Sequence, residues 1–168
     1  LRLRHDKSVD PSVYQGRFEV RGEVLMYKAV FAALNKQREA LGKPLFANPR
    51  NTAAGSLRQL DPALTAARPI RLFCYSIVDS SGAPPRRQLE SLALLRKLGF
   101  PVEENVHLCQ GIDQTISVVE ELAGQRASFP YEMDGMVIKL DDLRLAEALG
   151  VAKGVPAALN DMHKAYGA

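Results

Sequence analysis

The sequence predicts an α+β domain, and three observations support this. The chain has 168 residues, of which 46% are hydrophobic and 24% charged, a size and composition that suit one folded domain with its own core. Apolar residues recur at helical spacing in several segments and at strand spacing in others. These segments follow one another in the order β-α-α-β-α-(β)-α-β-α, where the strand in parentheses is the weakest prediction. Charged residues are concentrated on two of the strands.

Charge and hydropathy limit the class of protein. The net charge of +3 and the pI near 9.0 permit contact with a polyanion, but the basic residues form no long run. The longest apolar stretches, such as residues 29–34, are far shorter than the ~20 residues of a membrane helix. We therefore expect a cytoplasmic protein that makes no contact with membranes. Neither Cys74 nor Cys109 has a second ligand at metal-binding spacing, so no metal site is expected.

The first half of the chain predicts a strand and two helices. Residues 18–27 alternate apolar and charged side chains, as in a half-buried strand. Residues 28–41 are strong helix formers and precede a Gly and a Pro, which stop helices. Asn48-Pro49 combines an N-cap with proline at the first helical position, so a short helix should run to about Gln59 and end at Asp61-Pro62.

The second half predicts two more strands among three helices. Residues 69–78 are rich in Ile, Leu, Phe and Tyr, which indicates a strand buried on both sides. Leucines spaced by three over residues 89–98 predict a helix, and residues 112–122 predict a second one with an inner apolar face. Residues 131–140 again have the composition of a strand, and a short helix should follow over residues 143–149.

Three groups of polar residues are candidates for chemistry. Arg21 and Glu23 lie two apart on the first strand, so both side chains project from one face. A cation beside a carboxylate suits a polar ligand pocket. A solvated strand face is the alternative, and the spacing alone favours it.

The helix after Asn48 carries Arg50 in its first turn and Arg58 eight residues later, rotated by roughly 80°. Asn51 follows Arg50, and small residues separate the two arginines. Because a helix N-terminus favours anions, the pattern suggests phosphate binding; close helix packing is the alternative.

The third candidate group is Asp134 and Lys139 in the strand predicted over residues 131–140. Strict alternation would send residues five apart to opposite faces. They share a site only if Gly135 allows a bulge or Asp134 lies in the turn before the strand. An edge-strand lysine without a ligand is the alternative.

These motifs together resemble a known family. Glu-Val-Arg-Gly-Glu-Val at residues 19–24, the Asn-Pro-Arg-Asn and Ala-Gly-Ser-Leu-Arg-Gln-Leu-Asp-Pro sequences within residues 45–62, and residues 131–142 are similar to the adenylation (nucleotidyltransferase) domain of bacterial NAD-dependent DNA ligases. The resemblance extends over residues 1–150, and the middle motif is the most specific. It implies an ATP-grasp-like fold of mainly antiparallel sheets flanked by helices.

The resemblance also implies a reaction and its participants. A lysine attacks the α-phosphate of NAD and takes AMP, which passes to a DNA 5′-phosphate before a 3′-hydroxyl seals the nick in DNA replication and repair. The implied ligands are NAD, Mg²⁺ and nicked duplex DNA. By position in the motifs, Glu23, Asp134, Lys139 and Arg21 match nucleotide-binding residues, whereas Arg50, Arg58 and Asn51 match residues that bind DNA or phosphate.

Two departures from the family pattern shape the expected activity. The nucleophile motif Lys-x-Asp-Gly is absent from the 168 residues; Asp134-Gly135 has Glu132 at the lysine position and belongs to the later strand. Residues 151–168 diverge, with His163 where the family has its last pocket lysine and Lys164 one place on. We therefore expect a partial adenylation domain over residues 1–150 with a divergent tail, unable to ligate alone. The alternative is a non-catalytic nucleic-acid-binding or interaction module derived from that domain.

Overall fold

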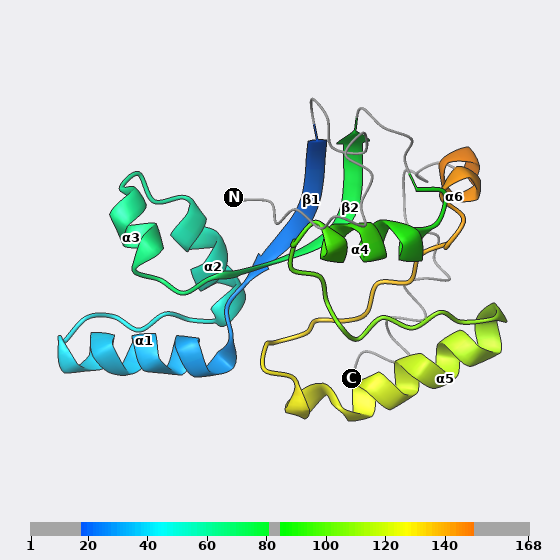
Figure 1. Cartoon of the computed structure of the whole chain (residues 1–168). Coiled ribbons are helices and arrows are strands. Elements are labelled where there is room, and N and C mark those ends of the chain that lie inside the picture. Colours follow the sequence, from blue (N-terminus) through cyan, green and yellow to red (C-terminus); the bar gives the residue numbers. More distant parts are fainter. Residues whose placement is uncertain (1–17, 81–84, 150–168) are drawn as a thin grey trace.

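The computed structural model describes residues 18–80 and 85–149, and this part of the chain is an α+β fold (Figure 1). The elements in chain order are β1 (Phe18–Leu25), α1 (Lys28–Ala40), α2 (Pro49–Leu57), α3 (Pro62–Ala66), β2 (Arg71–Ser80), α4 (Gln88–Lys97), α5 (Gly111–Gly124), the 3-10 helix η2 (Arg126–Ser128) and α6 (Leu143–Leu149). The predicted tail of residues 151–168, with His163 and Lys164, lies outside the described residues.

The core lies on one face of a two-stranded antiparallel sheet formed by β1 and β2. Helix α4 crosses this face (Figure 1) and buries its leucines against the strands. The buried cluster consists of Cys74, Leu92, Leu95 and Val102. Side chains from both strands, including Val20 and Ile77, pack around it. The apolar stripe predicted for residues 89–98 is therefore confirmed as the core face of α4.

Strand β2 contains two bulges that keep its apolar side chains on the core face. Val20 pairs with Ile77 and Gly22 with Cys74, so two steps along β1 correspond to three along β2. A second register shift lies between Glu19 and Val20. Because an extra residue changes the alternation of a strand, Cys74 and Ile77 both reach the core despite their odd spacing.

Gly22 is required by the close approach of the two strands. A Cβ atom at this position would lie 2.6 Å from the carbonyl oxygen of Phe73 and 2.8 Å from the Leu72 Cδ1 atom. Real side chains do not tolerate such distances. The glycine between Arg21 and Glu23 thus lets β1 and β2 pair where the candidate polar residues project.

The helix signals at the two Asx-Pro pairs gave one correct and one wrong expectation. Asn48 caps α2 as predicted, with its side chain accepting a hydrogen bond from the Asn51 backbone N–H at 2.7 Å. Asp61 does not end a helix but caps α3, accepting from the Ala63 backbone N–H at 2.9 Å. The same cap followed by proline starts a helix at both places, and α2 already ends at Leu57.

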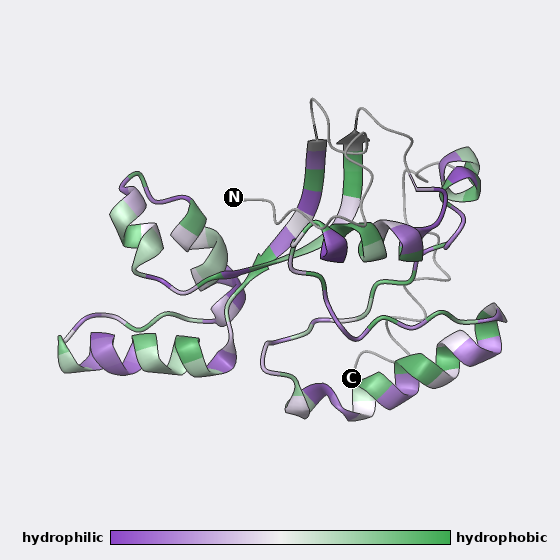
Figure 2. Ribbon diagram, viewed as in Figure 1, coloured by the Kyte–Doolittle hydropathy of each residue, from purple (hydrophilic) through white to green (hydrophobic). Residues whose placement is uncertain are grey.

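Three other expectations from the sequence are wrong. Residues 131–140 form no strand, and Val137 is 81% exposed. Strand β2 is not buried on both sides, because Tyr75 and Val78 are exposed. Helix α5 carries hydrophobic residues along its length (Figure 2), yet none of its residues is buried and Ile112 is 61% exposed. Within residues 18–80 and 85–149, no helix combines the length and hydropathy of a membrane span.

Candidate functional site

The centre of the candidate site is Arg50, which joins two acidic residues from distant segments. Its Nη2 atom lies 3.7 Å from Glu23 Oε1 on β1. Its Nη1 atom donates to Asp134 Oδ2, 84 residues further along the chain. All three side chains are more than 60% exposed. The structure thus brings together Glu23, Arg50 and Asp134, which come from three separate sequence motifs.

The start of α2 places Arg50 for this role. Asn48 is extended and caps the helix, Pro49 is buried at the first helical position, and α2 packs against β1. Thr52 and Ala53, in the first two turns, are also buried. Arg50 lies between these buried positions on the exposed side of the first turn, where its guanidinium reaches the polar face of β1.

Lys139, from the segment over residues 131–140, contacts the same sheet through Tyr75. The Lys139 Nζ atom lies 4.5 Å from the centre of the Tyr75 ring, on β2. Desolvation of the ammonium group, followed by repulsion from the Arg21 guanidinium, lowers the pKa of Lys139 from its ordinary value. Since residues 131–140 form no strand, strict alternation does not force Asp134 and Lys139 to opposite faces.

The segment that carries Asp134 and Lys139 is fixed at both ends. At its start, the Lys28 backbone N–H donates to the Pro130 carbonyl at 2.8 Å, and the Tyr131 ring packs edge-on against Phe73 at 5.8 Å. At its end, Asp141 Oδ1 accepts from the Leu89 backbone N–H at 3.0 Å and Oδ2 accepts from Arg87 Nη1 at 3.1 Å. Between these anchors, Asp134 contacts Arg50 and Lys139 contacts the Tyr75 ring.

Tyr131 and Glu103 contribute an anchor that the sequence analysis did not identify. Desolvation and then the hydrogen bond to Glu103 raise the pKa of Tyr131. For Glu103, desolvation raises the pKa, but hydrogen bonds from the Asn105 backbone N–H, the Tyr131 hydroxyl and the Asn105 amide outweigh it, so the pKa falls. The two residues are 28 positions apart, and no spacing rule in the sequence connects them.

Asn51 and Arg58 lie apart from the Arg50 contacts. The Asn51 side chain lines a pocket beside α2, and its backbone N–H donates to the Asn48 side chain that caps the helix. Arg58 is the exposed C-cap residue of α2. Its guanidinium makes no hydrogen bond or ion pair within the part of the chain that the structure describes. The two arginines of the α2 motif therefore differ: Arg50 belongs to a tertiary contact and Arg58 faces solvent.

The arrangement favours anion and hydroxyl recognition rather than nucleophilic chemistry. Glu23 offers an acceptor for a hydroxyl donor, and Arg21, Arg50 and Lys139 offer positive charge for a phosphate. Within residues 18–80 and 85–149, no group of three or more His, Cys, Asp or Glu side chains is placed to hold a metal ion. The site is a polar, largely exposed surface on the side of the sheet opposite α4.

Comparison with known proteins identifies the family. The family model for the NAD-dependent DNA ligase adenylation domain matches residues 6–159. A DNA ligase from Chloroflexus aggregans is 47% identical over 147 residues, which are 88% of this chain and 21% of that protein. DNA ligases from Paramagnetospirillum magneticum and Syntrophobacter fumaroxidans are each 47% identical over 138 and 134 residues, which are 82% and 80% of this chain. The chain spans about one fifth of the length of these relatives. It belongs to the NAD-dependent DNA ligase adenylation domain family.

Proposed function

We propose that this part of the adenylation domain binds the nucleotide and DNA phosphates during transfer of AMP from NAD to a nick. The family supports NAD as the nucleotide source, and the relatives named DNA ligase support nicked DNA as the final substrate. In this proposal Glu23 accepts a hydrogen bond from a nucleotide hydroxyl. Arg21 and Lys139 hold a phosphate between them, and Arg50 and Arg58 serve phosphate or DNA.

The observation that carries the proposal is the charged cluster beside β1 and β2, where Arg50 contacts Glu23 and Asp134 and the Lys139 ammonium lies over the Tyr75 ring. Desolvation, and then repulsion between the Arg21 and Lys139 cations, lowers the pKa of Lys139. A phosphate between them would offset this repulsion and restore the preference of Lys139 for its charged form. Glu23 lies two residues from Arg21 on the same face of β1, so a nucleotide with its phosphate at the cations can reach the carboxylate.

Mg²⁺ fits this site poorly. The nearest pair of carboxylates, Glu23 and Asp134, is already bound by the Arg50 guanidinium. A resident Mg²⁺ usually needs carboxylates together with substrate phosphates and waters in octahedral geometry. No step of the proposal therefore depends on Mg²⁺ held by these residues.

Titration of the 168-residue chain with NAD and with AMP tests the nucleotide site. Calorimetry should detect binding, and Lys139→Ala and Glu23→Ala should each weaken it at least tenfold. The matched controls are Lys97→Ala on α4 and Glu120→Ala on α5, both exposed and remote from the site, which should leave the affinity unchanged. Equal effects of the site and control variants would contradict the proposal. Binding of nicked duplex without any binding of NAD or AMP would instead support the non-catalytic module.

The chain should bind the nucleotide without forming a covalent adduct. None of its lysines lies in a Lys-x-Asp-Gly motif, and positioning of the nucleophile supplies much of the ~10⁶-fold or greater acceleration of such a step. Incubation with NAD and Mg²⁺ followed by intact mass spectrometry should show the unmodified mass. A stoichiometric increase by one AMP on a lysine would overturn this expectation.

A further inference from the structure

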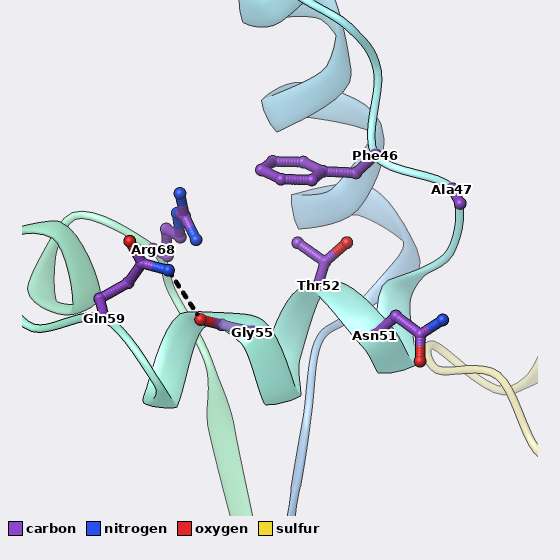
Figure 3. A pocket seen from close by; sticks show the side chains of 7 residues that line it. All are labelled: Phe46, Ala47, Asn51, Thr52, Gly55, Gln59 and Arg68. Atoms are coloured by element: carbon purple, nitrogen blue, oxygen red, sulfur yellow. Dashed lines mark hydrogen bonds between the residues drawn. The ribbon is translucent and has the colours of Figure 1, made fainter.

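A pocket of about 230 Å³ lies beside α2 and is separate from the contacts of Arg50. Figure 3 shows the Phe46 ring as one wall, with Thr52 and Gly55 of α2 facing it. Gln59 and Arg68 close one end of the pocket, and Asn51 stands at the other (Figure 3). The residues that line it include an aromatic ring, a guanidinium and two amides, but no acidic side chain.

Gly55 has no packing reason to be glycine. It lies inside α2, where glycine weakens a helix relative to alanine. A Cβ atom at Gly55 would meet no atom within 4 Å, in contrast to Gly22, where strand pairing forbids one. Because Gly55 lines the pocket, a larger side chain there would occupy pocket space. The glycine therefore weakens α2 while keeping this pocket open.

Arg68 gives the pocket a positive charge without an internal counter-ion. Its Nη1 atom donates to the neutral Ser56 Oγ at 3.3 Å, and its guanidinium lies 5.3 Å from the centre of the Phe46 ring. The Arg38 guanidinium lies 4.3 Å from the centre of the same ring. Among residues 18–80 and 85–149, no carboxylate forms an ion pair with either arginine. Half-buried cations of this kind favour an anionic ligand.

We propose that this pocket is a binding site for a phosphate group, distinct from the site around Arg50. Arg68 supplies the charge. The Gln59 Nε2 atom donates one N–H to the Gly55 carbonyl at 2.9 Å (Figure 3), so its second N–H and the Asn51 amide supply further hydrogen-bond donors. Two sources share this chemistry: the phosphate of a free nucleotide and the backbone phosphate of a nucleic acid. The inference depends only on the pocket and stands independently of the nucleotide site proposed above.

Titrations of the ¹⁵N-labelled chain with inorganic phosphate, AMP and nicked duplex DNA test the pocket. Binding should shift the NMR signals of the Gly55 amide, the Gln59 side-chain amide and the Arg68 Nε–H group. Saturation by inorganic phosphate or AMP identifies a free-phosphate site, and saturation by the duplex alone identifies a backbone-phosphate site. An absence of shifts at these three groups with all three probes would overturn the proposal.

Filling the pocket is the decisive variant. Gly55→Leu should place its side chain in the pocket and weaken phosphate binding there at least tenfold, with Gly55→Ala intermediate. Gly124→Leu is the matched control, because Gly124 is also a helical glycine with open space around its Cβ position and lies on α5. Both leucine variants should keep the wild-type circular dichroism, since leucine favours helices.

The Arg50→Ala variant separates this inference from the proposed function. It should leave the shifts at Gly55, Gln59 and Arg68 intact, because Arg50 does not line the pocket. Loss of these shifts in Arg50→Ala would mean that the pocket is part of the Arg50 site, which would contradict the proposal of a separate phosphate site. Unchanged phosphate affinity in a folded Gly55→Leu variant would overturn the pocket itself.

Discussion

The two faces of the β1–β2 sheet are built from the same strands but have opposite properties. The face under α4 is apolar and includes Cys74, which is 2% exposed. The other face carries Arg21 and Glu23; Glu23 forms an ion pair with Arg50 of α2, and Tyr75 forms a ring contact with Lys139 from the segment over residues 131–140. One face stabilises the fold, whereas the other presents charge to solvent. Substitutions on the two faces should therefore affect different measurements.

The largest effect on stability is expected at the α4 face. Leu95 is fully buried, so Leu95→Ala should lower the free energy of unfolding by about 2–5 kcal/mol through lost burial and the cavity left behind. The control is Leu57→Ala, since Leu57 is 53% exposed and should change stability by no more than ~0.5 kcal/mol. Urea unfolding followed by circular dichroism measures both. Similar urea midpoints for the two variants would contradict the expectation that the α4 face stabilises the fold.

Gly22 lies where β1 and β2 approach each other closely, and its substitution should have the next largest effect on the free energy of unfolding. The added methyl group of Gly22→Ala would meet the Phe73 carbonyl oxygen and force the strands apart, at a cost of about 1–3 kcal/mol. Gly124→Ala has open space and should instead be neutral or stabilising by up to ~1 kcal/mol. The comparison by urea unfolding needs no ligand. A destabilisation equal to that of the control would show that the strands separate freely here.

A pH-dependent effect is expected at Glu103, which fixes the start of the site segment through Tyr131. Its pKa is lower in the folded chain, so its stabilising contribution is complete above the ordinary value of 4.5 and disappears as the pH falls through the folded-state pKa. The wild type should lose stability between pH 6 and pH 3 more steeply than Glu103→Gln. Urea midpoints at the two pH values measure the difference. Parallel losses would show that Glu103 contributes nothing to this pH dependence.

The smallest effect on stability, together with a clear effect on binding, is expected for the double variant Arg50→Ala, Arg58→Ala. Both side chains are exposed, and surface ion pairs contribute only about 0–1 kcal/mol. Each lost phosphate contact should reduce the slope of log affinity against log salt by about 0.9, so the double variant should flatten it by up to ~2. Titration of nicked duplex at several salt concentrations measures the slope. An unchanged slope with an intact fold would assign these arginines a structural role.

The sequence predicted best those elements whose signals are local. The cap at Asn48, the leucine spacing of α4 and the short helix after Asp142 all appear at the expected residues. Asp61-Pro62 was misinterpreted, although it repeats the signal that correctly began α2. The motif residues Glu23, Arg50 and Asp134 were chosen from three separate segments, and the structure brings them together.

The errors concern properties that depend on partners distant in sequence. Residues 131–140 have strand composition, but a strand also needs a neighbour to complete its ladder, and the described part of the chain supplies none. The burial of β2 and α5 was overestimated for the same reason: apolar patterning identifies a face that can be covered, not the element that covers it. The bulges of β2 and the bond between Tyr131 and Glu103 have no periodic signature.

Arg50 contacts two carboxylates at once, and this has a consequence for any anion that binds it. Glu23 and Asp134 already contact the Arg50 guanidinium, so a phosphate that binds there in the proposed function would compete with these carboxylates for the same donors. The net affinity of the phosphate would then be the strength of its contact with Arg50 minus the strength of the carboxylate contact that it replaces. The carboxylate that loses Arg50 becomes available to another group, and release of Asp134 frees the middle of its segment between the two anchors. The proposed function therefore links phosphate binding at Arg50 to the path of residues 132–140 through one side chain.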